Sequence, residues 1–189
     1  VTSTGMTRRI EGSHLLVATG RKPNIEDLGL ATAGIDSSKG GIKVDESLRT
    51  ANPKVYAIGD VAGGLQFTHV ASYHAGLVIK NALFRLPVKA SSAIIPWVTY
   101  TDPELAHVGL TETEARKQHG DWVQVLTWPL HENDRAQADR RTEGLIKVVA
   151  GRGGRILGAS IVGANAGELI APWCLAITNR LKLKSFVDT

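Results

Sequence analysis

The feature that most constrains this chain is the stretch Val55–Asp60, a short apolar run that ends in Gly59-Asp60. Such a run predicts a buried strand whose last residue presents a carboxylate at the carboxyl edge of an α/β sheet, where open sheets bind ligands. An ionised aspartate only accepts hydrogen bonds, so its natural partners there are sugar or ribitol hydroxyls. Gly63-Gly64 then predicts a turn before an apolar helix over about residues 67–84, whose first N–H groups favour negative charge. The stretch indicates the edge of a nucleotide-cofactor site, although a plain turn aspartate fits the Gly-Asp pair equally well.

Three segments together resemble one protein family. Thr50–Val61, followed by His69-Val70-Ala71, resembles the second flavin-binding motif of the pyridine nucleotide–disulfide oxidoreductases, the family of lipoamide dehydrogenase, glutathione reductase and mercuric reductase. Val17–Asn24 resembles the segment that leaves the nicotinamide domain of that family, and Tyr100–Glu112 resembles the opening of its interface domain. The three motifs come in the family's order and cover essentially the whole chain, so the match is specific.

The resemblance implies a fold class of α/β plus α+β: the C-terminal part of an FAD-binding domain followed by an interface (dimerisation) domain. Residues 1–22 are expected to be the end of an NAD(P)-binding domain. Residues 23–92 are expected to be the C-terminal half of the FAD-binding domain. Residues 93–189 are expected to be the dimerisation domain, truncated at its C-terminus.

The resemblance also implies cofactor contacts. Gly59 and Asp60 are implied to bind FAD, and the start of the following helix is implied to meet the pyrimidine end of the flavin. Reduced flavin is negatively charged there, and N–H groups at a helix start stabilise such charge. A histidine at this start with no paired carboxylate in the sequence favours a structural role over a catalytic one. Gly20 is implied to lie beside NAD(P)H, although a plain strand-exit turn explains it equally well. The expected cofactor-binding residues are Gly59, Asp60, Gln66, Phe67, Thr68, His69 and Gly20, with no catalytic residue and no metal ligand.

Apolar periodicity predicts the remaining elements of the first half. His14–Ala18 is an apolar run that predicts a buried strand. Asp27–Ile35 predicts a short helix or turn that Gly34 ends. The cluster Ser37–Gly41 predicts a loop, and the alternating residues 42–45 predict a half-buried strand.

From residue 94 the pattern changes to strand and helix pieces of a separate α+β domain. Thr111 and Glu114 form a capping-box pattern, which predicts a helix that ends at Gly120. Pro172 lies inside the last helical pattern and predicts a kink or tightened first turns. Other elements are predicted over residues 95–100 (strand), 122–128 (strand), from 133 (turn or short helix), 145–150 and 156–162 (hairpin), and 166–182 (helix).

The composition of the chain argues against nucleic acid and membranes as partners. The net charge is +4, lysines and arginines are dispersed, and aromatic residues make up only 5% of the chain, which argues against a nucleic-acid groove. The sequence has no run of 18 apolar residues and no signal peptide at its start, so we expect no membrane segment and a cytoplasmic location.

The family's other motifs are missing from these 189 residues. There is no Gly-x-Gly-x-x-Gly behind a strand, no Cys-x4-Cys pair and no His-Pro-Thr segment, and Cys174 is the single cysteine. Without a second cysteine, Cys174 reads as a small buried hydrophobe. We therefore expect the chain to be an internal piece of an FAD-dependent NAD(P)H:disulfide or mercuric ion oxidoreductase, inactive alone. The alternative is a non-catalytic dimerisation module, homodimeric through its C-terminal domain. The electron acceptor (lipoyl group, glutathione-type disulfide or mercuric ion) and the choice of NADH or NADPH stay open.

Overall fold

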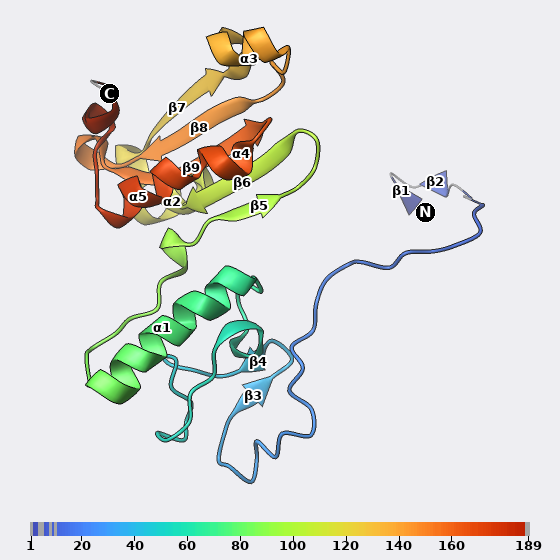
Figure 1. The fold of residues 1–189 in the computed structure, drawn as a ribbon, viewed down its shortest axis with the longest axis vertical. Helices are drawn as coiled ribbons and strands as arrows, with labels where there is room; N and C mark the ends of the chain where they lie inside the picture. The colour runs from blue at the N-terminus through green and yellow to red at the C-terminus, as the bar shows by residue number, and fades with distance from the viewer. Residues whose placement is uncertain (1, 4–5, 8, 10, 188–189) are drawn as a thin grey trace. The chain divides into compact units, whose positions relative to one another are not determined.

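The computed structural model describes residues 2–3, 6–7, 9 and 11–187, and it divides into two compact units, Val1–Ile79 and Lys80–Thr189 (Figure 1). The parts of the predicted NAD(P)-binding segment at residues 1, 4–5, 8 and 10 lie outside the described residues. None of the helices in the described part is both long and apolar enough to span a bilayer.

The N-terminal unit is built from turns, two small hairpins and the larger part of one long helix, which continues into the other unit. Its core packs Ile35, Ile42 and Ala57 against the apolar side chains of the surrounding turns. The hairpin β3–β4 places Ser37 opposite Ile42. The loop predicted over residues 37–41 is therefore wrong at Ser37, Ser38 and Gly41, which lie in β3 and β4, and the strand predicted over residues 42–45 ends at residue 42. The elements that begin in the N-terminal unit are β1 (Thr2–Ser3), β2 (Met6–Thr7), β3 (Ser37–Ser38), β4 (Gly41–Ile42), η1 (Gly59–Ala62) and α1 (Thr68–Phe84).

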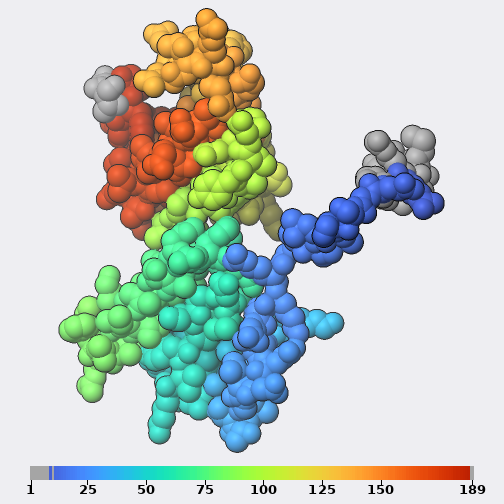
Figure 2. All heavy atoms as spheres, turned by 45° about the vertical axis from the view of Figure 1, so that its right-hand side comes forward, coloured from blue at the N-terminus to red at the C-terminus, as the bar shows by residue number. Residues whose placement is uncertain are grey.

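Two predicted buried strands of this unit are wrong. Leu15, Leu16 and Val17 are 89%, 88% and 71% exposed and unpaired, in the blue N-terminal stretch of Figure 2. In the Val55–Asp60 stretch, Tyr56 makes one isolated antiparallel bridge, to Arg49, and a 3-10 turn begins at Gly59. An apolar run forms a strand only where neighbours complete its ladder, and the described residues supply none for the first run and a single bridge for the second. The helix predicted over about residues 67–84 is confirmed as α1.

The C-terminal unit is an antiparallel five-stranded sheet in the order β5-β6-β9-β8-β7, with helices on both faces (Figure 1). The predicted hairpin of residues 145–150 and 156–162 is confirmed as β8 and β9, which pair side by side. The sequence did not predict the inner strand β6, which lies between β5 and β9. The elements of the C-terminal unit are η2 (Ser92–Ile94), β5 (Trp97–Thr99), β6 (Glu104–Gly109), α2 (Glu112–His119), η3 (Gly120–Trp122), β7 (Gln124–Pro129), η4 (Leu130–Glu132), α3 (Asp134–Asp139), β8 (Leu145–Ala150), η5 (Arg152–Gly154), β9 (Ile156–Gly163), α4 (Ala166–Leu169), α5 (Ala171–Thr178) and η6 (Leu183–Phe186).

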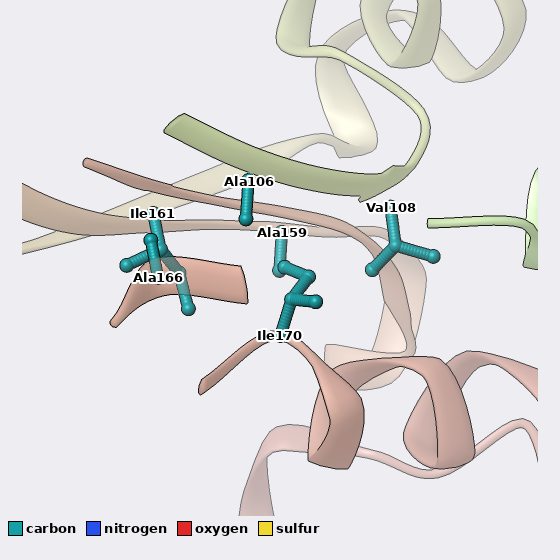
Figure 3. Packing of buried hydrophobic residues seen from close by; sticks show 6 residues of the cluster. All are labelled: Ala106, Val108, Ala159, Ile161, Ala166 and Ile170. Carbon is teal, nitrogen blue, oxygen red and sulfur yellow. The ribbon is translucent and has the colours of Figure 1, made fainter. Parts of the chain in front are cut away.

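The main core lies between this sheet and the helices α4 and α5. Ala106, Val108, Ala159 and Ile161 point from the two central strands toward Ile170 (Figure 3). Small residues on the strands let the helices approach closely, so these side chains are almost completely buried. A second cluster, built on Ala115, Val123 and Val149, packs α2 on the sheet.

Local signals set the helix ends of this unit. The Thr111 hydroxyl accepts the Glu114 N–H at 3.3 Å, and the Glu114 carboxylate accepts the Thr111 N–H at 2.9 Å, so the capping box is confirmed. The Thr111 hydroxyl also donates to the Glu114 carboxylate at 2.7 Å, and this bond, followed by the one from the Thr111 N–H, holds the pKa of the Glu114 carboxyl below its ordinary value. The final helical pattern is split into α4 and α5 just before Pro172, as a proline that lacks the N–H requires, and α5 ends at Thr178 rather than at residue 182.

Candidate functional site

The candidate site lies in the N-terminal unit, where η1 meets the start of α1. Asp60 is the second residue of η1, and its carbonyl accepts the Gly63 N–H at 3.1 Å, which closes the turn. The Asp60 side chain is 48% exposed, so its carboxylate is available to a ligand. An ionised carboxylate at such a position can accept hydrogen bonds from hydroxyl groups.

Arg21 lies beside this carboxylate. Its Nη1 is 3.9 Å from Asp60 Oδ2 and donates a hydrogen bond to the Gln66 carbonyl at 2.8 Å. One guanidinium group therefore contacts both the acidic turn and the residue that precedes the helix start. The pair is exposed, so it contributes little to stability.

Gly59 fixes the turn against α1. Its φ of +64° lies in the left-handed region, and a Cβ at this position would stand 2.8 Å from the Cβ of Ala71. Its N–H donates to the Nδ1 of His74 at 3.2 Å. His74 is half-buried, and burial lowers the pKa of its imidazole below the ordinary value. The turn thus lies close to α1 because Gly59 has no side chain, and one hydrogen bond joins the two.

The start of α1 carries four of the predicted residues. The N–H groups of Val70 and Ala71 both donate to the Phe67 carbonyl, at 3.0 and 3.2 Å, so the chain enters the helix at Phe67. The rings of Phe67 and His69 are stacked, with centroids 5.4 Å apart. Thr68 and His69 are exposed, and the helix dipole makes this end favourable for negative charge.

Gly20 stands apart from the other predicted residues. Its φ is +140°, and a Cβ built on it would have no neighbour within 4 Å. The structure brings Asp60 together with Gln66 through Arg21, and Gly59 together with α1. Gly20 is joined to this group as the chain neighbour of Arg21.

Sequence reasoning missed Arg21 and His74. Arg21 directly follows Gly20 in the family-like segment, so its position was a usable signal, but its partner Gln66 is 45 residues away along the chain. His74 was interpreted as part of the apolar face of the helix, and its contact with Gly59 depends on the tertiary packing of α1.

The described part of the chain has few side chains that could take part in redox chemistry or bind a metal ion. Cys174 lies in the other unit, where its Sγ donates to the Ile170 carbonyl at 3.4 Å and burial raises the pKa of the thiol. A buried thiol of this kind packs as a small hydrophobe, as predicted. No group of three His, Cys, Asp or Glu side chains that could bind a metal ion occurs among the described residues.

Comparison with known families gives two matches. Residues 95–189 match the family described as "Pyridine nucleotide-disulphide oxidoreductase, dimerisation domain", and residues 1–75 match the one described as "Pyridine nucleotide-disulphide oxidoreductase". The first range lies in the C-terminal unit and the second in the N-terminal unit.

The chain is similar in sequence to mercuric reductases and dihydrolipoyl dehydrogenases. Mercuric reductase of Lysinibacillus sphaericus is 40% identical over 191 residues, which are 100% of this chain and 35% of that protein. Dihydrolipoyl dehydrogenase of Geobacillus stearothermophilus is 40% identical over 175 residues, 92% of this chain and 37% of that protein. The chain therefore spans little more than a third of the length of these relatives.

Solved structures give the same match in three dimensions. The crystal structure of LpdA from Mycobacterium tuberculosis superimposes on 96% of this chain with a TM-score of 0.88 and 29% identity, over 40% of the LpdA chain. RclA from Escherichia coli, described as an HOCl-induced flavoprotein disulfide reductase, superimposes on 87% of this chain with a TM-score of 0.74 and 31% identity, over 38% of its own chain.

Proposed function

Because the chain belongs to the pyridine nucleotide-disulphide oxidoreductase family, we propose that the whole protein is an FAD-dependent oxidoreductase that uses NAD(P)H. In the proposed reaction the nicotinamide loses a hydride, and a disulfide or a thiol-bound mercuric ion takes up the two electrons. The names of the similar proteins, mercuric reductase and dihydrolipoyl dehydrogenase, support both acceptors equally. The proposal therefore leaves the acceptor, and the choice between NADH and NADPH, open.

The observation that carries the proposal is the exposed Asp60 carboxylate at the start of η1, next to Arg21 and the start of α1. These groups fit FAD chemically. Asp60 can accept hydrogen bonds from ribityl hydroxyls, and the N–H groups of the first helical turn can donate to the acceptors at the pyrimidine end. When bound, FAD would supply the two-electron chemistry that links nicotinamide oxidation to disulfide reduction. We assign cofactor contacts to Gly59, Asp60, Gln66, Phe67, Thr68 and His69 for FAD, and to Gly20 for the nicotinamide.

We also propose that three domains of the family contribute to the chain: an NAD(P)-binding domain over residues 1–22, an FAD-binding domain over 23–92 and a dimerisation domain over 93–189. The matched ranges 1–75 and 95–189, which leave residues 76–94 between them, support the second boundary. A cytoplasmic location remains a prediction from the sequence.

The 189-residue chain by itself is expected not to oxidise NADH or NADPH with a disulfide substrate, even when FAD is added. Electron transfer to a disulfide needs a thiolate with a partner thiol, and Cys174 is both unpaired and half-buried. The measurement is absorbance at the reduced-nicotinamide band, with the full-length protein as the positive control. Sustained absorbance loss by the short chain, above a sample without protein, would mean that the chemistry lies within these residues.

The second candidate function, a dimerisation module, is favoured by exposed apolar side chains on the C-terminal unit. Trp97 and Trp173 are partly covered, so the surplus apolar surface lies elsewhere, at Trp128 and Leu169, which are 54% and 45% exposed. Beside Leu169 is a cavity of about 390 Å³, lined in part by Leu130 and Ile146. An obligate dimer interface of this family's kind commonly buries more than ~2,000 Å² and is rich in such side chains.

We expect the chain to sediment as a homodimer through residues 93–189, at twice its 20.2 kDa mass. The substitution Leu169→Glu should shift the population toward the monomer, because it puts a charge into the apolar surface beside the cavity. Gln118→Glu is the control, since it also adds one negative charge, but at a polar, exposed position on α2 that does not line that cavity. Analytical ultracentrifugation at micromolar concentration measures both, and a wild-type chain that sediments only as a monomer would contradict the proposal.

A further inference from the structure

His74 makes a contact that the proposed function does not use. It lies within α1, beyond the helix start that is assigned to the flavin. Its Nδ1 accepts the N–H of Gly59 at 3.2 Å, across 15 residues of sequence. Gly59 is buried and directly precedes Asp60, so this N–H has little access to water and depends on a protein acceptor.

The geometry fixes the protonation state of the ring. An imidazole nitrogen that accepts a hydrogen bond carries no proton, so neutral His74 must hold its proton on Nε2. Protonation of Nδ1 would place two donors against each other, and the buried Gly59 N–H would lose its partner. The turn that presents Asp60 is therefore supported only by the neutral form of this side chain.

We propose that His74 is a positioning residue for the flavin-contacting turn, which it holds by accepting the Gly59 N–H as a neutral imidazole. The inference rests on the proposed function, because it concerns the site at which FAD is assigned. His74 touches no cofactor or substrate in this account, and it acts through Gly59 on the position of Asp60.

The surrounding groups favour the neutral form. Burial alone lowers the pKa of His74, and no charged neighbour contributes to the shift. The ionisable groups beside the contact are Asp60 on η1, Arg21 at its carboxylate, and Tyr73, whose ring lies 5.8 Å from that of His74. Because the folded-state pKa lies below the ordinary value, the support is complete above the ordinary pKa and is lost as the pH falls through the folded pKa.

The test measures the affinity of the full-length protein for FAD as a function of pH, by the quenching of flavin fluorescence. From about pH 8 to about pH 5, the wild-type affinity is expected to fall about tenfold, as one proton binds to His74. His74→Asn should remove this dependence, since the amide oxygen can replace Nδ1 as an acceptor and does not titrate. His74→Leu should bind FAD about tenfold more weakly at every pH. His119→Asn, an exposed histidine on α2, is the control and should behave as wild type.

The outcomes separate this inference from the proposed function. Wild-type protein that does not bind FAD at all would overturn the proposed function together with the role of His74. FAD binding with a pH dependence that survives in His74→Asn would overturn only the role of His74. If His74→Leu fails to fold by circular dichroism, the comparison of wild type with His74→Asn still decides the question.

Discussion

Replacing Gly158 by alanine is expected to destabilise the C-terminal unit by about 3 kcal/mol or more, the cost of severe overpacking in a core that cannot relax. A Cβ at this position would stand 2.0 Å from the Leu110 carbonyl oxygen and 2.8 Å from the Leu110 nitrogen. These are backbone atoms held in place, because the Leu110 N–H donates to the Leu157 carbonyl at 2.9 Å. The clash can be relieved only if β9 moves away from the end of β6.

The matched control for this prediction is Gly153→Ala, at the turn that precedes β9. Its φ is +69° and a Cβ there meets no atom within 4 Å, so only backbone strain is introduced, at about 1 kcal/mol. Tryptophan fluorescence during urea unfolding isolates this unit, because all four tryptophans lie between residues 97 and 173. Equal unfolding midpoints for the two variants would show that the strand packing at Gly158 is not as described.

The second large effect is expected for Gly59→Ala in the full-length protein, which should purify without bound flavin. Alanine at this position combines a φ of +64° with a Cβ only 2.8 Å from the Cβ of Ala71, so the turn must move away from α1. That movement would also break the hydrogen bond to His74 and shift Asp60. Strain and contact together are expected to cost about 3 kcal/mol.

The variant Gly29→Ala separates the effect of backbone strain from the effect of the close contact with Ala71. Gly29 has almost the same φ, +63°, and a Cβ there would meet no atom within 4 Å. This variant should keep its flavin, as judged from the visible absorbance per polypeptide. Loss of flavin from both variants would assign the effect to general backbone strain, and retention in both would remove Gly59 from the site.

Features with local causes could be predicted from the sequence. The capping box needs only Thr111 and Glu114, three residues apart, and the proline break needs only Pro172. The helix α1 and the hairpin β8–β9 carry their own apolar periodicity. These predictions were accurate because each depends on residues that are neighbours along the chain.

Features that depend on partners could not be predicted this way. The run His14–Ala18 is apolar enough for a strand, but the described residues give it nothing to pair with, and its side chains are exposed. In the opposite direction, β6 pairs on both edges although its sequence was interpreted only as a family motif.

The candidate site likewise contains residues that the sequence could predict and residues that it could not. The positions of Gly59 and Asp60 were found from a strand-like run and a resemblance, although the run is a bridge and a 3-10 turn. Arg21 and His74 were missed because their partners are 45 and 15 residues away and are brought close only by folding.

The most direct measurement of the central claim, that Asp60 contacts FAD, is an FAD titration of the full-length protein with and without that carboxylate. Asp60→Ala is predicted to weaken FAD binding by about 1–3 kcal/mol, the usual effect of losing a charge-assisted hydrogen bond. Asp36→Ala, which removes an exposed aspartate elsewhere in the same unit, should bind FAD as the wild type does. If Asp60→Ala binds FAD as tightly as the wild type, the cofactor does not contact this turn.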